Sequence, residues 1–272
     1  MSGGVLVLAA TPIGDPRDAA PRLADELRIA DVVAAEDTRR LRRLCQDLDV
    51  NPTGRVVSYH EHNEAERTAQ ILPRLVAGER VALTSDAGLP GVSDPGARLI
   101  AAALEAGVPV TVLPGASAVE TALVASGLLG ERYQFLGYLP RTEKARSALW
   151  EELARWPHPA VAFESPRRLS ASLRSLASVS PDRRVAVCRE LTKRFEEVVR
   201  GTASEVAERF AEPPRGEITL VLGAVEAERG PDEDARAAVA ELVAAGAGRR
   251  QAADVVARLT SGSRNELYRE SL

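Results

Sequence analysis

Aromatic side chains and cysteines are scarce in this sequence of 272 residues. Phe, Trp and Tyr together make up 4% of it, and the two cysteines, Cys45 and Cys188, lie in unrelated segments. Two isolated cysteines argue against a disulfide framework and against a cysteine-based zinc site. Hydrophobic residues still account for 45% of the chain, which is enough for a packed core of Ala, Val, Leu and Ile. We therefore expect a globular, cytoplasmic protein with reduced thiols.

Long apolar runs are also missing. The first run, Val5–Ala10, is ended by Thr11-Pro12 and has no basic residues before it. It is too short for a signal sequence or a membrane span, and no other stretch approaches the length of a span. We interpret this run as a buried first strand and expect no membrane association.

Lysine is nearly absent, because Lys144 and Lys193 are the only two and arginine carries almost all of the positive charge. The formal net charge is −4, which by itself disfavours a nucleic-acid partner. A GC-rich genome explains the arginine bias most simply. Arginine also suits forked contacts to phosphate, so the bias is compatible with RNA but does not argue for it.

Two cofactor motifs and a metal motif are missing as well. No G-x-G-x-x-G opens a helix and no Walker lysine is present, which argues against a dinucleotide cofactor and against a nucleoside triphosphatase. His60 and His62 form an H-x-H pair, but no cysteine accompanies them and His158 is isolated. We therefore expect no metal site.

Short Val-rich runs alternate with amphipathic segments in the first part of the chain. The runs expected to form strands are Val5–Ala10, Val32–Ala35, Val56–Ser58, Val81–Thr84 and Val108–Leu113. The segments expected to form helices are Asp18–Ile29, Thr38–Leu48, Glu64–Ala77 and Pro95–Ala106. This alternation predicts an α/β fold with a mainly parallel sheet, helices on both faces, and ligands at the carboxyl ends of the strands.

A second α/β set follows the breaker Pro114-Gly115. Its expected strands are Tyr133–Gly137, Ala160–Phe163, Arg184–Cys188 and Ile218–Leu222, and its expected helices are Glu143–Arg155, Pro166–Ala177 and Ser204–Phe210. After a hinge at Arg229-Gly230-Pro231, the expected helices are Asp234–Ala244, Arg249–Leu259 and a short one opened by the capping box Ser263-x-x-Glu266. We predict an N-terminal α/β domain at 1–115, a second α/β domain at 116–228 and a helical tail at 229–272.

Every strand of the first domain ends in a polar loop. These loops are Ala10–Asp15, Ala35–Arg39, Ser58–Glu64, Thr84–Gly96 and Pro114–Ala118. In a doubly wound sheet they share one rim. The glycines and prolines of the first and fourth loops predict a cradle for a ligand without phosphates, held by backbone groups and shape. S-adenosylmethionine is such a ligand.

Simpler structural roles remain open for several of these residues. The pairs that match helix capping boxes are Ser117 with Glu120 and Asn63 with Glu66. Asp86 and Asp94 could merely brace the fourth loop. Glu36-Asp37 could be a solvated pair, although two carboxylates at the end of a strand are also good candidates for acid–base chemistry.

Several short segments, taken together, form a pattern that is more specific than any one of them. In chain order they are ATPIGD, AAEDTR, SYHEHNE, SDAGLPGVSDPG, PGASA, ESPRR, RELTKRFEEVVRG and RGE. This set resembles the ribosomal RNA small-subunit methyltransferase I family of the tetrapyrrole methylase superfamily. The resemblance covers about residues 5–223, and the tail ending SRNELYRESL is also similar. PGAS alone is a weak motif, whereas SDAG-x-P-x-x-SDPG with EDTR and YHEHNE is highly specific.

The resemblance implies 2′-O-methylation of a decoding-centre cytidine in 16S rRNA, with S-adenosylmethionine as donor, by a homodimer. It also implies a two-domain fold with a mixed sheet in the second domain and the cofactor in the cleft between domains. The residues implied to bind the cofactor are Pro12, Ile13, Gly14, Asp86, Gly88, Leu89, Pro90, Val92, Ser93, Ser117, Ala118, Phe163, Glu164, Leu191 and Ile218. The sequence departs from the family pattern at Leu89, at Gly91-Val92 and at Arg167. Backbone contacts should tolerate the first two departures, whereas Arg167 lacks a titratable group, so we assign it no proton transfer.

The candidate bases for the ribose hydroxyl are Glu36, Asp37, His60 and Glu61. The candidate RNA contacts are Arg39, His62, Asn63, Arg167, Arg168 and Lys193. An acidic protein would recognise the folded 16S rRNA of the 30S particle through shape and a local arginine-lined cleft. Two alternatives are a methylase acting on a precorrin or uroporphyrinogen and a non-catalytic ribosome-assembly factor. The histidine-rich third loop and EDTR favour RNA over a macrocycle.

Overall fold

The computed structural model describes residues 3–225, 233–260 and 262–271. Contacts between residues divide the chain into two compact units, Met1–Ala224 and Val225–Leu272. The expected hinge at Arg229-Gly230-Pro231 and the expected domain limit at 228/229 lie outside the described residues. The limit at 115/116 falls inside the first unit and stays a prediction.

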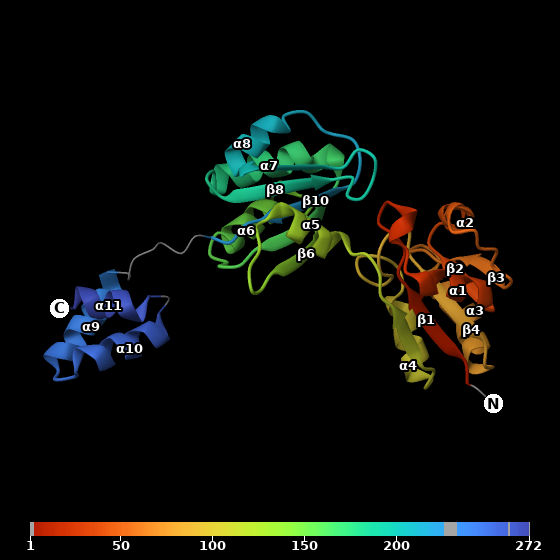
Figure 1. Cartoon of the computed structure of the whole chain (residues 1–272), viewed down its shortest axis with the longest axis horizontal. Coiled ribbons are helices and arrows are strands. Elements are labelled where there is room, and N and C mark those ends of the chain that lie inside the picture. Colours follow the sequence, from red (N-terminus) through yellow and green to blue (C-terminus); the bar gives the residue numbers. More distant parts are fainter. Residues whose placement is uncertain (1–2, 226–232, 261, 272) are drawn as a thin grey trace. The chain divides into compact units, whose positions relative to one another are not determined.

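The first sheet has five strands, and all of its neighbouring pairs are parallel. The strands are β1 (Val5–Ala9), β2 (Val32–Ala35), β3 (Arg55–Ser58), β4 (Arg80–Thr84) and β5 (Val110–Leu113), in the order β3-β2-β4-β1-β5 (Figure 1). Because the strands are parallel, their carboxyl ends lie along one edge of the sheet. The predicted α/β fold with a parallel sheet is confirmed.

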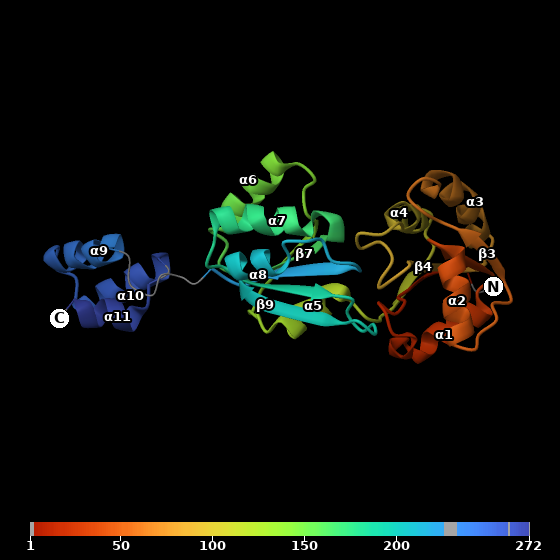
Figure 2. The ribbon, with the colours of Figure 1, turned by 90° about the horizontal axis from the view of Figure 1, so that it is seen from above.

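Helices cover both faces of the first sheet (Figure 2). They are α1 (Pro21–Ile29), α2 (Thr38–Asp47), α3 (Glu64–Val76) and α4 (Ala97–Glu105). Along β1, Leu6 and Leu8 pack in one core with residues of α3 and α4, whereas Val7 and Ala9 pack in the other core with residues of α1 and α2. Both faces of the strand are therefore buried, which explains why the sequence shows continuous apolar runs instead of alternation with polar residues.

The second sheet is mixed. Its strands are β6 (Gln134–Tyr138), β7 (Ala160–Glu164), β8 (Arg184–Arg189), β9 (Glu197–Thr202) and β10 (Ile218–Leu222), in the order β6-β7-β10-β8-β9. β6 and β7 run parallel, and the other neighbouring strands run antiparallel. The expected mixed sheet is confirmed.

The two faces of the second sheet carry different helices (Figure 2). The helices are α5 (Ala118–Ser126), α6 (Glu143–Leu153), α7 (Pro166–Val179) and α8 (Ala203–Arg209). α6, α7 and α8 pack on one face around the fully buried Trp150. α5 packs on the other face, against Val161 of β7 and Val221 of β10. Ile13, from the loop after β1, belongs to this last core, so the second sheet anchors a loop of the first.

The sequence pattern does not predict β9 or α5. β9 is an edge strand that pairs only with β8 in the sheet order, and it contains Arg200 and Gly201 where a regular strand would be apolar. Its strand conformation depends on the antiparallel pairing with β8, which is a tertiary contact. α5 begins directly after Ser117, so the start signal was present although no helix was assigned there.

The capping boxes are wrong in their side-chain contacts, although the helix starts are right. Helices begin directly after Asn63, Ser117 and Ser263, yet within the described chain none of these side chains accepts a hydrogen bond from its own first turn. The Ser117 hydroxyl donates to Glu120 instead. A capping box does form at the start of α8, between Thr202 and Glu205.

α1 starts at Pro21 instead of the expected Asp18. Pro16–Asp18 forms a separate 3-10 turn, in which the Arg17 amide donates to the Asp15 carboxylate at 2.9 Å. Ala20, the residue before Pro21, is extended because proline disfavours the helical conformation in its predecessor.

The second unit is helical, as expected. Its helices are α9 (Glu233–Ala244), α10 (Arg249–Leu259) and α11 (Arg264–Glu270). They enclose a small core of their own that consists of Ala235, Val239, Ala252, Ala253, Val256 and Leu267. None of the helices in the described ranges is long and apolar enough to cross a membrane.

Candidate active site

A cavity of about 750 Å³ opens at the carboxyl ends of the strands of the first sheet. Its walls come from the loops after β1, β2, β4 and β5, and from residues of β7, β8 and β10 in the second sheet. This volume is typical of sites for small organic ligands. The third of the five polar loops expected on this rim does not contribute to the cavity, because none of Ser58–Glu64 lines it. β3 is an edge strand, so its loop lies at the end of the rim.

Most of the residues expected to bind a cofactor line this cavity. They are Ile13, Asp86, Gly88, Leu89, Val92, Ser117, Ala118, Phe163, Glu164, Leu191 and Ile218. Pro12, Gly14, Pro90 and Ser93 belong to the same loops but are not among the lining residues. Direct contact of any of these residues with a cofactor stays a prediction.

The first and fourth loops are joined to each other through their backbones. The Thr11 amide donates to the Gly88 carbonyl at 2.8 Å, and the Gly88 amide donates to the Thr11 carbonyl at 3.0 Å. The Thr11 hydroxyl also donates to the carbonyl of Ser85 at 3.2 Å. Gly88 has a positive φ of 80°, which a residue with a side chain rarely adopts. These bonds give the two loops one fixed arrangement at the cavity wall.

Gly14 holds the first loop against the second sheet. A Cβ atom at this position would lie 2.5 Å from the Thr192 hydroxyl and 2.7 Å from the Leu191 carbonyl. The neighbouring Asp15 amide donates to the Thr192 hydroxyl at 3.0 Å. The structure thus places Gly14 in a tight contact between two loops, outside the cavity lining.

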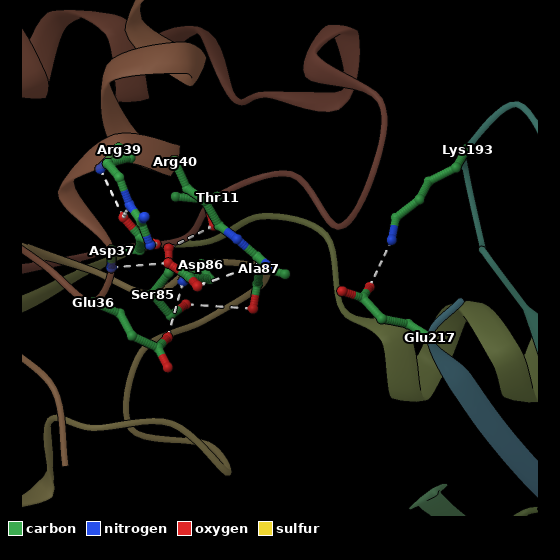
Figure 3. A network of polar contacts seen from close by, with 10 residues as sticks. All are labelled: Thr11, Glu36, Asp37, Arg39, Arg40, Ser85, Asp86, Ala87, Lys193 and Glu217. Atoms are coloured by element: carbon green, nitrogen blue, oxygen red, sulfur yellow. Dashed lines mark hydrogen bonds and ion pairs between the residues drawn. The ribbon is translucent and has the colours of Figure 1, made fainter. Parts of the chain in front are cut away.

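The second and fourth loops are tied together by carboxylates (Figure 3). Glu36 accepts a hydrogen bond from the Asp86 amide at 3.1 Å, and Asp86 accepts one from the Asp37 amide at 3.0 Å. Arg40 lies 3.4 Å from the second oxygen of Asp86. Asp37 caps α2 through the Arg39 amide and forms an ion pair with the Arg39 guanidinium at 2.8 Å. Glu36 and Asp86 line the cavity, whereas Asp37 does not.

The pKa values of these carboxyl groups are shifted in different directions. Hydrogen bonds from Arg39 hold the pKa of Asp37 far below its usual range. Burial raises the pKa of Glu36. Burial, followed by repulsion from Glu36 and Asp86, raises the pKa of Asp94 to about 7. Asp94 also lines the cavity. The cavity therefore contains one carboxyl group, Asp94, that can exchange a proton near neutral pH, and Asp37 is a poor base.

The third loop is organised around Asn63 and Glu64. Asn63 accepts a hydrogen bond from the His60 amide at 2.8 Å, and its amide nitrogen lies 3.2 Å from the ring of His60. Glu61 and His62 are exposed. Glu64 accepts hydrogen bonds from the amides at the start of α4. The structure brings neither His60 nor Glu61 to the cavity, so neither is placed for acid–base chemistry there.

The candidate RNA-binding cations of the second half differ in how they are paired. Arg168 forms an ion pair with the buried Glu164 at 2.5 Å and donates to the carbonyl of Leu139. Lys193 lies 3.0 Å from Glu190 and also 2.7 Å from Glu217, and the second pair is drawn in Figure 3. Both cations are therefore committed to internal partners.

Other expected RNA contacts are open to solvent. Arg39 is exposed while paired with Asp37. Arg167 is exposed and makes no ion pair within the described chain. His62 lies beside His60, with ring centroids 6.0 Å apart. Of the expected RNA contacts, Arg39, Arg167 and His62 thus remain accessible, whereas Asn63 supports its own loop.

A second acidic group lies at the start of α5. Glu120 accepts hydrogen bonds from the Ser117 hydroxyl and from the Tyr133 hydroxyl, the latter at 2.5 Å. These hydrogen bonds lower the pKa of Glu120 and raise that of Tyr133. All three residues line the cavity. Ser117 is thus held at the wall by a charged partner.

Sequence reasoning missed several residues of the cavity wall as functional residues. Asp94 had been considered only as a brace for its loop, although its Ser-Asp-Pro-Gly context repeats the Ser-Asp of the preceding turn. Arg40 directly follows Arg39, which alone was named as a candidate from the sequence. Glu217 lies in the RGE motif but was given no role, and Tyr138 has no sequence signal; both line the cavity. The part of the chain that the structure describes contains no group of three or more His, Cys, Asp or Glu side chains arranged to hold a metal ion.

The chain resembles a known protein family over most of its length. A family profile for tetrapyrrole (corrin/porphyrin) methylases matches residues 5–207. A protein of Mycobacterium tuberculosis named ribosomal RNA small subunit methyltransferase I is 49% identical over 270 residues, covering 98% of this chain and 94% of that protein. The protein of the same name from Synechocystis is 40% identical and covers 99% of this chain and 98% of that protein.

Solved structures share the fold. The methyltransferase CobJ superposes with a TM-score of 0.61 at 21% sequence identity, covering 82% of this chain and 95% of that chain. Uroporphyrin-III C-methyltransferase from Thermus thermophilus, crystallised with S-adenosyl homocysteine, has a TM-score of 0.57 at 22% identity, covering 82% of this chain and 98% of that chain. At this identity the similarity concerns the fold alone.

Proposed function

Since this chain belongs to the ribosomal RNA small subunit methyltransferase I family of the tetrapyrrole (corrin/porphyrin) methylases, we propose that it methylates small-subunit ribosomal RNA with S-adenosylmethionine as donor. The finer proposal is 2′-O-methylation of a decoding-centre cytidine in 16S rRNA. By likeness to the family, the enzyme is a cytoplasmic homodimer that acts on the assembled 30S particle. The observation that carries the choice of substrate is the charge of the cavity wall.

The donor suits the cavity because the cavity is lined both by aromatic side chains and by carboxylates. S-adenosylmethionine combines a sulfonium cation with an adenine ring. The aromatic rings of Phe135 and Phe163 meet edge to face at 5.1 Å on one wall, and Tyr138 packs on Phe163 at 5.6 Å. Carboxylates from the loops of the first sheet form the opposite wall. The residues proposed to hold the donor are those of the predicted set that line the cavity.

The acidic wall argues against a tetrapyrrole substrate. The carboxylates that line the cavity are Glu36, Asp86, Asp94, Glu120, Glu164 and Glu217, and Arg40 is the sole cation among the described lining residues. Glu164 and Glu217 are paired with Arg168 and Lys193, so the excess of negative charge lies with the other four carboxylates and Arg40. A precorrin or uroporphyrinogen carries many carboxylates of its own, and like charges disfavour each other strongly in a partly desolvated cavity. A ribose hydroxyl is neutral and can enter while the phosphates on either side of it stay outside.

In the proposed reaction the protein aligns the two reactants and removes one proton. When bound, the donor supplies a methyl group on a sulfonium that leaves as a neutral sulfide. The chain's own part is to hold the ribose oxygen in line and to exclude water, which together can supply several kcal/mol of the barrier reduction. A base must also accept the hydroxyl proton, and among the four original candidates Glu36 alone lines the cavity.

Contacts to the phosphate backbone would come from the exposed arginines. Arg39, Arg40 and Arg167 are exposed and lie on the loop or first turn that follows β2 or β7. Because the net charge is −4, attraction to RNA must be local. Binding should weaken as salt rises, and binding to 30S particles that is insensitive to salt would count against an RNA substrate.

The deciding experiment uses 30S particles from a strain that lacks this protein. Purified protein and labelled donor are added, and ribose methylation is mapped along the 16S rRNA. We expect one new 2′-O-methyl group in the decoding centre. Parallel reactions contain naked 16S rRNA or uroporphyrinogen. Methylation of the macrocycle and not of the particle would replace this proposal with the tetrapyrrole reading, and donor binding without any methylation would favour an assembly factor.

A further inference from the structure

Four aromatic side chains among the described residues line the cavity, and their rings are covered to different degrees. Phe135 and Phe163 are partly buried and pack in the core that α5 covers. Tyr133 donates a hydrogen bond to Glu120. Tyr138 also lines the cavity, yet 63% of its surface is exposed. Its ring therefore lies at the opening of the cavity, in contact with Phe163 and with surface left for a further partner.

A bulge in β6 turns Tyr138 toward the cavity. Between two register pairs with β7, β6 advances three residues, from Phe135 to Tyr138, while β7 advances two. Side chains alternate along a regular strand, so residues three positions apart would point to opposite faces. Here both rings contact Phe163, with centroids 5.1 Å and 5.6 Å away. Gly137 has the positive φ of 65° that lets the bulge form, and bulges commonly re-aim one side chain beside a site.

Exposed cations follow the ends of the same two strands. β6 and β7 run parallel, so their carboxyl ends lie at one edge of the second sheet. Arg141 comes three residues after Tyr138, and Arg167 comes four residues after Phe163. Both arginines are exposed, and neither forms an ion pair within the described chain. An aromatic ring and cations suited to phosphate thus occur together at this edge.

The charges near Tyr138 favour an uncharged partner for its ring. Partial burial, followed by the charges of Asp94, Glu217 and Glu36, raises the pKa of this tyrosine, so its hydroxyl stays protonated. The same carboxylates would repel a phosphate group at this position. A nucleobase is uncharged, and its flat face stacks well on an aromatic ring. An RNA chain can therefore present a base to Tyr138 and its phosphates to the exposed arginines.

The target nucleotide needs a new stacking partner in order to react. The donor is proposed to lie inside the cavity, so the ribose must enter it, and the base is then drawn away from its neighbours in the folded RNA. Loss of those stacking contacts costs free energy, which enzymes offset by stacking the displaced base on their own side chains. The donor itself needs an enclosed place from which water is excluded. The open surface of Tyr138 is therefore left to the other reactant.

We propose that the base of the target nucleotide stacks on Tyr138 while its ribose enters the cavity, and that Gly137 is the residue that positions the ring. The inference rests on the proposed function and names the side chain that holds the nucleotide. No covalent bond changes in this step. Because every base has a flat face, the ring contributes affinity and not the choice between bases.

The first test is Tyr138→Leu, which keeps an apolar side chain beside Phe163 and removes the ring. We expect kcat/KM on 30S particles to fall by about 10- to 100-fold. Donor affinity, measured by calorimetry, should stay within about threefold of wild type. Tyr138→Phe keeps the ring and should restore most of the rate, since the hydroxyl makes no hydrogen bond within the described chain. Equal losses in the two variants, or a loss of donor affinity that accounts for the whole fall, would overturn the stacking role.

A substrate that lacks the base separates stacking from mere support of the cavity wall. 30S particles are reconstituted with 16S rRNA in which the target nucleotide, once mapped, carries no base. Wild-type kcat/KM on these particles should be about 10- to 100-fold lower than on intact ones. Tyr138→Leu should cost no more than about threefold on them, because the ring and the base form one interaction. If the substitution costs as much on abasic as on intact particles, the ring does not contact the base and the inference is wrong.

Gly137 is tested as a positioning residue with two substitutions. Asparagine tolerates a positive φ, whereas the β-branched valine does not. A Cβ atom at this position would lie 4.0 Å from the Ser93 hydroxyl, so space is not the limit. We expect Gly137→Val to lower kcat/KM at least about tenfold on intact particles and no more than about threefold on abasic ones, and Gly137→Asn to restore most of the rate. Equal losses of Gly137→Val on both kinds of particle would overturn the positioning role.

The outcomes separate this inference from the proposed function. If wild-type protein methylates no 30S particle, the proposed function fails. If it methylates intact particles and Tyr138→Leu keeps more than a third of kcat/KM, the stacking role is wrong while the function stands.

Discussion

The two walls of the cavity treat their charges in opposite ways. On the wall built from the first sheet, Asp86 lies 3.4 Å from Arg40, whereas Glu36 and Asp94 form no ion pair within the described chain and the pKa of each is raised. On the wall built from the second sheet, Glu164 is paired with Arg168 at 2.5 Å and Glu217 with Lys193 at 2.7 Å. Unbalanced charge is costly to bury, whereas balanced charge can be rigid and inert.

The two sheets contribute different kinds of side chain to the cavity. The first half contains Glu36 and Asp94, whose pKa values are raised mainly by burial, and that of Asp94 is raised to about 7. The second half supplies an apolar, aromatic surface braced by the ion pairs Glu164–Arg168 and Glu217–Lys193.

The largest expected effect comes from breaking a balanced pair. Arg168→Ala leaves the carboxylate of Glu164 buried without its cation, which should destabilise the protein by about 3–5 kcal/mol. Urea unfolding measures the loss. Arg167→Ala, one residue earlier and exposed, is the control and should change stability by less than about 0.5 kcal/mol. Similar losses in the two variants would mean that the pair does not hold the second wall.

A smaller loss is expected where the two halves touch. Gly14→Ala would place a methyl group 2.5 Å from the Thr192 hydroxyl and 2.7 Å from a backbone carbonyl, so one loop must move. We expect a cost of about 1–3 kcal/mol in the free energy of unfolding, together with weaker donor binding. Gly3→Ala, where nothing lies within 4 Å, should change neither. Unchanged donor affinity in Gly14→Ala would show that this contact does not shape the cavity.

The two helix starts offer a matched pair of hydroxyl deletions. Thr202→Ala removes the side chain that caps α8 and should cost about 1 kcal/mol in thermal or urea unfolding. Ser117→Ala removes a hydroxyl that makes no cap and donates to Glu120, so its effect on stability should be smaller. A larger loss at Ser117 would contradict the assignment of that residue to the cavity wall.

The smallest effect should have the opposite sign. The pKa of Asp94 is raised in the folded state, so the folded protein loses stability as pH rises from about 4 to about 7, where the unfolded chain is already ionised. Asp94→Asn should therefore raise the melting temperature at pH 8 by about 2–4 °C, with the advantage fading toward pH 4. A stabilisation that did not depend on pH would show that charge is not its cause.

Much of the architecture followed from local pattern. The β-branched runs placed the strands of the first sheet to within two residues, since fully buried parallel strands must be apolar on both faces. The polar loops at the strand ends could also be predicted from the sequence. The edge strand β9 could not be predicted from the sequence, because its conformation depends on pairing with β8 across the sheet.

The sequence predicted less of the site than of the fold. Loop membership could be assigned from the sequence, but the direction of each side chain could not. Arg167 and Arg168 are adjacent in one motif, yet one is exposed and the other is paired with a buried carboxylate. The raised pKa of Asp94 depends on its burial and on its neighbours Glu36 and Asp86, and no spacing in the sequence reveals either.

The sequence by itself determined the parallel sheet, the polar loops along its rim and the family to which the chain belongs. The tertiary structure alone decided which loop residues meet at the cavity, which cations are already paired, and that Glu64 holds the chain beside Asp94 although the two are 30 positions apart. The physical reason is that periodicity and composition report local preferences and burial. Proton affinity and side-chain direction, in contrast, are set by whatever the fold brings within a few ångströms.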